Sequence, residues 1–477
     1  MSEVVAPGKP VLSREERIAL GKEARTRAPR SSHGAWAPAA DRRDPISVFE
    51  DEATDRVPGL VPIRYGRMLT SPLSFFRGSA SLMAGDLAGS PNSGIQAQLC
   101  GDAHLSNFGL FGSPERQLMF DVNDFDETLP GPWEWDVKRL AASFEILGRE
   151  LGFSKLERRC VVLGSVRQYR RRMLRSARMS TLEAWYAHLE VDRLLAGVHD
   201  AAASGELTKQ EAKAAERRVE QAFARDHVRV LAKRTDTVDG ELRIVANPPL
   251  IVPVEEFVQP DSEWAQTNEV ITRLLRSYRK TLMHDHHHPI EEFRVVHAAR
   301  KVVGVGSVGT RCFILLLLGS DESDPLFLQV KEAEPSVLER HVGKSVYHHH
   351  GERIVVGQRL MQAASDIFLG WQTVTGLDGI ARDYYVRQLH DWKGGVAVEN
   401  FRPGGAELYA RLCGATLARA HARSGDRIAI AAYLGRGDAF DRAVADFAVA
   451  YADQNERDFE AFAYAVRTGR LPVLTGI

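Results

Sequence analysis

The stretch that decides the fold of this chain is residues 302–333, VVGVGSVGTRCFILLLLGSDESDPLFLQVKEA. Three runs rich in apolar and β-branched residues, VVGVG, TRCFILLLLG and DPLFLQVKEA, are separated within it by turns rich in glycine and aspartate. Such runs, bounded by such turns, are typical of short β-strands. The stretch therefore predicts a three-stranded antiparallel meander.

The glycines of this stretch follow the pattern GxGxxG at Gly304, Gly306 and Gly309. In a dinucleotide-binding unit a helix follows these glycines directly, whereas here the β-like run 311–318 follows. A glycine-rich turn between antiparallel strands is instead the arrangement with which protein kinases cover ATP phosphates. Glycine lets backbone N–H groups approach the anion closely. We therefore expect the nucleotide to be bound by Gly304, Gly306, Ser307 and Gly309.

Lys331 lies inside an apolar strand, where an unpaired ammonium group is costly. The kinase arrangement offers it two kinds of partner, the α- and β-phosphates and a glutamate on the next helix. A helix is predicted near 351–364, so Glu352 is the favoured glutamate and Glu339 is the alternative. The competing interpretation is an edge strand whose lysine extends to solvent.

A second polar motif, LCGDAHLSN, lies far upstream at residues 99–107. It follows a β-like run and precedes a predicted hairpin that ends in the acidic segment 121–127. Phosphoryl transfer needs one carboxylate that orients or deprotonates the attacking hydroxyl, and an Asn and a second Asp that hold Mg²⁺. Asp102 and Asn107 supply the first carboxylate and the amide, and the hairpin would bring the second acid to the same edge.

The two motifs supply complementary halves of one active site, but in the reverse of the order found in ordinary kinases. We therefore predict an α+β, two-lobed protein-kinase-like fold that is circularly permuted, with a β-rich nucleotide lobe inserted between two helical stretches that form one helical lobe. The predicted parts are an N-terminal arm (1–55), a helical lobe with the catalytic loop and metal-binding hairpin (56–245), the nucleotide lobe (246–395) and C-terminal helices (396–477).

Composition narrows the function further. The 477 residues include 62 Lys and Arg against 63 Asp and Glu, a net charge of −1, which argues against general nucleic-acid binding. The four cysteines are far apart, which argues against a disulfide scaffold and favours the cytoplasm. The longest strongly apolar run, 312–318, is too short to cross a bilayer, and the N-terminal residues lack an apolar signal segment. We expect a cytoplasmic protein that binds neither nucleic acid nor membrane.

Several long strings resemble a bacterial family known as domain-of-unknown-function 2252. The resemblance covers the chain from about Pro29 to the C-terminus. It rests on PIRYGRMLTSPLSFFRG, LCGDAHLSNFGLF, NDFDETLPGPWEWDVKRLAAS, VVGVGSVGTRC, LQVKEA, GQRLMQAASDIFLGW and LARAHARSGD. The family name implies no established reaction.

The upstream loop also resembles the HGDxHxxN catalytic loop of aminoglycoside phosphotransferases and related small-molecule kinases. The residues that match this pattern are Asp102, His104 and Asn107. Cys100 stands where many of these enzymes have histidine. The resemblance implies that Asp102 and His104 are catalytic and that Asn107 holds the metal together with Asp124 or, alternatively, Asp121. It also implies that Asp136 braces the loop.

Three arginines upstream of this loop, Arg64, Arg67 and Arg77, have two interpretations. Guanidinium groups suit phosphates and carboxylates, so these residues could bind a phosphate or an acidic substrate. An amphipathic helix that turns its arginines outward is an equally good interpretation.

The favoured function is a Mg²⁺- and ATP-dependent phosphotransferase acting on a hydroxyl of an unknown small molecule or protein. A nucleotidyl transferase, which would AMPylate its acceptor, would use the same groups. A metallophosphoesterase with Asp102 and His104 as ligands lacks the DxH and Gly-Asn-His motifs of such enzymes and leaves Lys331 unexplained. A non-catalytic nucleotide-binding regulator would not need the catalytic groups.

Overall fold

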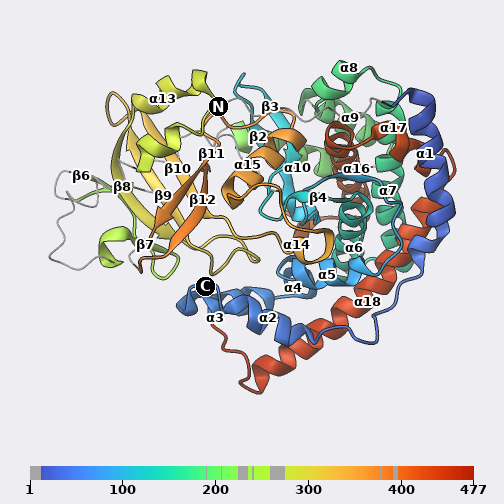
Figure 1. Ribbon diagram of the computed structural model, residues 1–477, viewed down its shortest axis with the longest axis horizontal. Coiled ribbons are helices and arrows are strands. Elements are labelled where there is room, and N and C mark those ends of the chain that lie inside the picture. Colours follow the sequence, from blue (N-terminus) through green and yellow to red (C-terminus); the bar gives the residue numbers. More distant parts are fainter. Residues whose placement is uncertain are drawn as a thin grey trace.

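The computed structural model describes residues 12–189, 191–205, 207–223, 235–238, 241–257, 274–376, 378–389 and 396–477. Within them the fold is mixed α+β, with one six-stranded sheet and three two-stranded sheets. The large sheet lies on one side of the molecule and most helices lie on the other (Figure 1). None of the described helices is both long and apolar enough to span a membrane.

The large sheet is antiparallel throughout, with the strand order β11-β12-β10-β9-β8-β7. Its strands are β7 (Ile251–Pro253), β8 (Arg294–Lys301), β9 (Cys312–Leu318), β10 (Pro325–Glu332), β11 (Gly370–Thr375) and β12 (Ala381–Gln388). Lys331 on the central strand β10 pairs with Cys312 of β9 on one side and Tyr385 of β12 on the other.

The predicted meander is present as β8, β9 and β10, but its first strand was misplaced. VVGVG is not a strand; residues 302–311, here named the glycine connection, join β8 to β9. The reason is backbone conformation, since Gly304 and Gly309 have φ angles of 68° and 99°, which a β-strand does not allow.

The principal helices come from both ends of the chain and pack into one body. They are α1 (Arg14–Arg27), α6 (Glu134–Glu150), α7 (Lys155–Ser176), α16 (Pro403–Ser424), α17 (Arg427–Leu434) and α18 (Ala439–Arg467). Helices α7 and α16 approach closely, because a Cβ on Gly414 would lie 2.2 Å from the carbonyl oxygen of Ser165. Trp133 stacks on Tyr169 in the same core, with ring centroids 5.5 Å apart.

Four short helices near the N-terminus lie in the lower half of the view in Figure 1. They are α2 (Pro45–Ala53), α3 (Val61–Met68), α4 (Pro72–Arg77) and α5 (Ala80–Ala88). Side-chain caps start two of them, since Asp44 accepts from Ser47 N and Ser71 accepts from Ser74 N. Phe49 and Phe75 anchor them in a shared apolar cluster with Phe462 of α18.

The small sheets and the remaining helices connect these parts. The small sheets are β1 (Gln96–Leu99) with β4 (Leu129–Pro132), β2 (Phe108–Gly112) with β3 (Leu118–Val122), and β5 (Thr235–Val238) with β6 (Glu241–Ile244). The helices are α8 (Thr181–Tyr186), α9 (Val191–Ala203), α10 (Lys209–Phe223), α13 (His287–Glu291), α14 (Glu339–Val342) and α15 (His350–Met361). The β2–β3 pair confirms the predicted hairpin. Helix α15 contacts β1, β11, β12 and α16, and so joins the large sheet to the helical body.

Candidate active site

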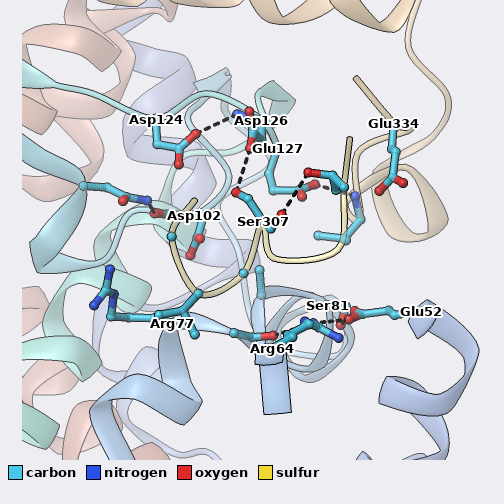
Figure 2. A pocket seen from close by; sticks show the side chains of 18 of the residues that line it. Glu52, Arg64, Arg77, Ser81, Asp102, Asp124, Asp126, Glu127, Ser307 and Glu334 are labelled. Carbon is cyan, nitrogen blue, oxygen red and sulfur yellow. Dashed lines mark hydrogen bonds and ion pairs between the residues drawn. The ribbon is translucent and has the colours of Figure 1, made fainter. Parts of the chain in front are cut away.

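A polar pocket lies where the β2–β3 hairpin, the glycine connection and the short N-terminal helices meet (Figure 2). Its walls come from three parts of the sequence, 52–81, 102–127 and 304–354. The predicted site residues that line it are Asp102, His104, Asn107, Asp124, Gly304, Gly306 and Ser307. The two distant motifs therefore open onto one cavity.

The loop that carries Asp102 is braced from behind by Asp136 of α6. The Asp136 carboxylate accepts from Cys100 N at 2.9 Å and Gly101 N at 3.1 Å, and lies 3.2 Å from His421 Nε2. Gly101 has a φ angle of 82°, and a Cβ there would lie 2.3 Å from the Glu127 carbonyl oxygen. The bracing role predicted for Asp136 is confirmed, and glycine is needed at the sharp turn before Asp102.

Asp102 lies in the pocket between a cation and an imidazole. Arg139 Nε donates to its Oδ1 at 2.5 Å, and His104 Nε2 lies 3.7 Å from its Oδ2. Burial raises the pKa of the Asp102 carboxyl above its ordinary value, and the attraction of Arg139 offsets only part of this. A carboxylate with a raised pKa is a better proton acceptor than an ordinary aspartate.

His104 is 3% exposed and stays uncharged. Burial lowers the pKa of its imidazole well below the ordinary value, and the nearby Arg77 and Arg139 lower it further. Its Nδ1 accepts from Ser106 N at 3.2 Å, so the hydrogen of the neutral ring is on Nε2, which faces Asp102. His104 therefore carries no positive charge, and its Nε2 lies beside Asp102 but beyond hydrogen-bond distance of it.

The oxygen donors expected for Mg²⁺ come together beside Asp102. Asn107 Nδ2 donates to the carbonyl oxygen of Asp102 at 2.8 Å, which leaves its amide oxygen available. Asp124 accepts from Asp126 N at 3.3 Å and forms no ion pair with any described residue. Burial raises the pKa of Asp124, and the neighbouring Asp126 carboxylate raises it further. An additional cation would relieve this repulsion.

The described residues contain no group of three or more His, Cys, Asp and Glu side chains arranged as a complete metal cage. Mg²⁺ does not need one, because it usually binds through one or two carboxylates, several waters and the phosphates of its substrate. The donor set of Asn107 and Asp124 therefore fits a Mg²⁺ ion that arrives with a phosphorylated ligand.

Lys331 projects from β10 toward the hairpin and pairs with Asp126. Burial alone would lower the pKa of the Lys331 ammonium, but Asp126, Tyr385 and Asp124 together outweigh burial and raise it well above its ordinary value. Tyr385 donates to Asp126 at 2.8 Å and Ser307 Oγ donates to it at 3.3 Å. Asp126 thus links the large sheet, the glycine connection and the hairpin.

The predicted pairing of Lys331 with Glu352 is wrong. Glu352 lies in the first turn of α15, where its backbone N–H donates to His349 Nδ1, and it does not line the pocket. The alternative, Glu339, also lies off the pocket wall. The physical reason is that Asp126, on the facing hairpin, already neutralises the ammonium group, so no helix glutamate is needed.

Asp121, the alternative metal ligand, is buried in an ion pair away from the pocket. It lies within β3, where its side chain and that of its ion-pair partner Arg419 are each 1% exposed. It also accepts from Val122 N at 2.9 Å and Ala363 N at 3.0 Å. Asp121 is not on the pocket wall, so the alternative that made it a metal ligand is wrong; of the two aspartates, only Asp124 lines the pocket.

The glycine connection covers the pocket from the sheet side, and its last glycine lies outside the wall. Gly309 O instead accepts from Val57 N at 2.8 Å, and Arg56 Nη1 donates to Val308 O at 2.6 Å. Arg67 Nη1 donates to Gly304 O at 2.7 Å. The N-terminal helices therefore hold this connection over the pocket.

The N-terminal wall is the part of the site that sequence reasoning left open. Arg64 is 1% exposed, so the outward-facing interpretation is wrong for it, and both Arg64 and Arg77 line the pocket. Glu52 pairs with Arg64 at 2.5 Å, and the sequence carried no signal for this glutamate.

Fold and site together define an α+β protein with a polar, acid-rich pocket between a glycine-rich connection and a braced Asp-Asn loop. The chain belongs to the bacterial family described as "Uncharacterized protein conserved in bacteria (DUF2252)", whose profile matches residues 56–465. The predicted family resemblance is thereby confirmed. No curated protein and no solved structure matches the chain. The family description names no reaction, so the function is argued from the site.

Proposed function

We propose that the protein is a Mg²⁺- and ATP-dependent phosphotransferase. The observation that carries the proposal is the meeting, on one pocket, of the Asp102 loop, the Asp124 carboxylate, which forms no direct ion pair with a described residue, and the glycine connection. These groups match the needs of phosphoryl transfer, which are a proton acceptor, oxygen ligands for Mg²⁺ and backbone N–H groups over the phosphates.

In the proposed reaction the oxygen of an acceptor hydroxyl attacks the terminal phosphorus of ATP. Asp102 accepts the hydroxyl proton, the bond from the terminal phosphorus to the bridging oxygen breaks, and its electron pair leaves with ADP. Arg139 holds Asp102 in position through the hydrogen bond from its Nε. Asn107 and Asp124 would hold Mg²⁺, which supplies charge neutralisation at the phosphate oxygens. Lys331, kept charged by Asp126, would bind the α- and β-phosphates.

The proposed architecture is a permuted kinase-like fold with the large sheet as its nucleotide lobe. Three features support it: the glycine connection joins two antiparallel strands, Lys331 lies on the third strand of the meander, and α15 follows that strand. The helical stretches before and after the sheet pack as one body, with α16 against α7. Asp102, Asn107 and Asp124 of one half and Ser307 of the other line the same pocket, and Lys331 is joined to its wall through the ion pair with Asp126.

Nucleotide binding is the first test. Calorimetric titration of ATP with Mg²⁺ into wild type and Lys331→Ala should show an affinity loss of about tenfold or more, because a charge-assisted phosphate contact is removed. The matched control is Lys344→Ala, since Lys344 is exposed and off the pocket wall. Equal binding by wild type and Lys331→Ala, or binding by neither, would contradict the proposal.

The nature of the transferred group needs a second readout. Wild type incubated with a panel of metabolites and peptides should transfer label from ATP carrying it on the γ-phosphate. Transfer of label from the α-phosphate would instead indicate the nucleotidyl reaction, which uses the same residues but attacks a different phosphorus.

A further inference from the structure

Arg77 is the last residue of α4, and its side chain lines the pocket. No described residue forms a hydrogen bond or an ion pair with its guanidinium group, and its Nε is buried without a partner. A buried donor without an acceptor is costly, so such a group in a pocket indicates a missing ligand atom. Burial lowers the pKa of the Arg77 guanidinium, and the nearby Asp102 and Asp124 carboxylates offset part of this by favouring its charged form.

The other arginines around the pocket already have hydrogen-bond partners within the protein. Arg64 Nη2 donates to Glu52 at 2.5 Å and to Gly78 O at 3.0 Å. Arg56 Nη1 donates to Val308 O at 2.6 Å, and Arg139 Nε donates to Asp102 at 2.5 Å. Of the three arginines on the described pocket wall, Arg77 alone makes no hydrogen bond.

The position of Arg77 is fixed by its backbone. A Cβ on Gly306 would lie 3.2 Å from the Arg77 carbonyl oxygen, so the tip of the glycine connection rests directly on the end of α4. Figure 2 shows the Arg77 side chain extending below Asp102 along the same wall of the pocket. The backbone of Arg77 therefore contacts the glycine connection, while its guanidinium lies on the pocket wall below Asp102, within electrostatic reach of the Asp102 and Asp124 carboxylates.

We propose that Arg77 binds the phosphoryl group that is transferred, through hydrogen bonds from its guanidinium to the non-bridging oxygens; this inference rests on the proposed function. A planar guanidinium matches two phosphate oxygens at once and stays protonated throughout. Charge spreads over those oxygens in the transition state, where a fixed cation is most effective. Arg77 moves no proton in this role; the proton of the acceptor goes to Asp102.

The test compares ligands that differ only in the terminal phosphoryl group. ADP and the β,γ-imido analogue of ATP are titrated, each with Mg²⁺, into the full-length wild type, Arg77→Gln and the control Arg340→Gln, whose arginine is exposed and off the pocket wall. Arg77→Gln should lose about tenfold or more in affinity for the triphosphate analogue and stay within about twofold for ADP. Equal losses for both ligands, or no loss, would overturn the assignment.

Binding of inorganic phosphate shows whether the oxyanion that contacts Arg77 comes from the nucleotide or from the acceptor. In the proposed site, phosphate binds the wild type together with ADP and Mg²⁺, and Arg77→Gln abolishes this binding. If phosphate binds the wild type equally well with and without ADP, and Arg77 is needed both times, the oxyanion belongs to the acceptor and the assignment fails.

Chemical rescue distinguishes a direct contact from a structural role. Free guanidinium at millimolar concentration should restore part of the phosphoryl-transfer rate of Arg77→Ala, whereas urea at the same concentration should not. Rescue by both, or by neither, would contradict direct contact. If the wild type binds neither nucleotide, the proposed function fails; if it binds both and Arg77→Gln behaves like wild type, only the role of Arg77 fails.

Discussion

The two walls of the pocket are held in opposite ways. The loop around Asp102 is fixed from behind by buried groups: Asp136 accepts from its backbone, and Tyr409 donates to Leu105 O at 2.8 Å. The glycine connection has buried anchors only near its ends, at Val302 and Val308, whereas its tip is held by side chains such as Arg67, which contacts Gly304 O at 2.7 Å in an exposed position.

We call the loop around Asp102 the rigid wall of the pocket and the glycine connection its detachable wall. Regions with few buried contacts open at a lower free-energy cost than the core does. We therefore expect a ligand to enter by displacement of the glycine connection, while the acid loop keeps its geometry. Substitutions on the two sides of the pocket test this contrast.

Asp136→Ala should have the largest effect, because it leaves the backbone N–H groups of Cys100 and Gly101 buried without an acceptor. We expect a loss of about 3 to 5 kcal/mol in the free energy of unfolding. Urea unfolding checks this against Asp438→Ala, which removes a carboxylate that is 52% exposed and should change stability by about 0.5 kcal/mol or less. Similar effects for the two variants would mean that the acid loop is not the rigid wall.

A pair of glycine substitutions compares the two walls directly. Gly101→Ala places a Cβ 2.3 Å from Glu127 O at a φ angle of 82°, so it should cost about 3 kcal/mol. Gly306→Ala meets Arg77 O at 3.2 Å and should cost about 1 kcal/mol or less. Denaturation of both variants in urea measures these costs.

The same pair should differ in ligand binding. Gly306→Ala should weaken nucleotide binding, because its Cβ keeps the backbone N–H groups from the anion. Titration of ATP with Mg²⁺ into the folded variant checks this. If Gly306→Ala destabilised the protein as much as Gly101→Ala, the glycine connection would be part of the rigid body.

Part of the site could be predicted because some of its residues are energetically unfavourable in their local sequence unless they have a partner or a function. A lysine in an apolar strand and an Asp-Asn loop after a strand need a reason to be there, so Lys331, Asp102 and Asn107 stood out. The distinction between Asp121 and Asp124 depends on where β3 ends, which places Asp121 inside the strand and Asp124 beyond it. Strand ends are weakly encoded in sequence, so this choice stayed open.

The remainder could not be predicted because it depends on contacts between distant elements. Lys331 pairs with Asp126, and no local pattern shows that a hairpin rather than a helix faces β10. The wall formed by Glu52, Arg64 and Arg77 depends on the short N-terminal helices packing against the glycine connection. Arg64 and Arg77 were noted as possible anion ligands, but a sequence pattern does not show whether an arginine faces a pocket or solvent.

An effect that depends on pH is expected where the two walls meet, because Glu127, in the loop after β3, accepts from Val337 N at 2.7 Å. Burial raises the pKa of Glu127 to about 7 from an ordinary 4.5. Below pH 4.5 the carboxyl is protonated in both folded and unfolded chains. As pH rises toward 7 the unfolded chain loses the proton first, so the free energy of unfolding falls.

Glu127→Gln removes this titration while keeping an oxygen that accepts from Val337 N. The stability of the variant relative to wild type should therefore rise between about pH 5 and pH 8, by about 2 to 3 kcal/mol. Urea unfolding at several pH values measures this stability difference. The control is Glu322→Gln, at an exposed turn, whose stability relative to wild type should not change with pH. A flat difference for Glu127→Gln would mean that water enters where the two walls meet, so that the detachable wall already stands partly open in the free protein.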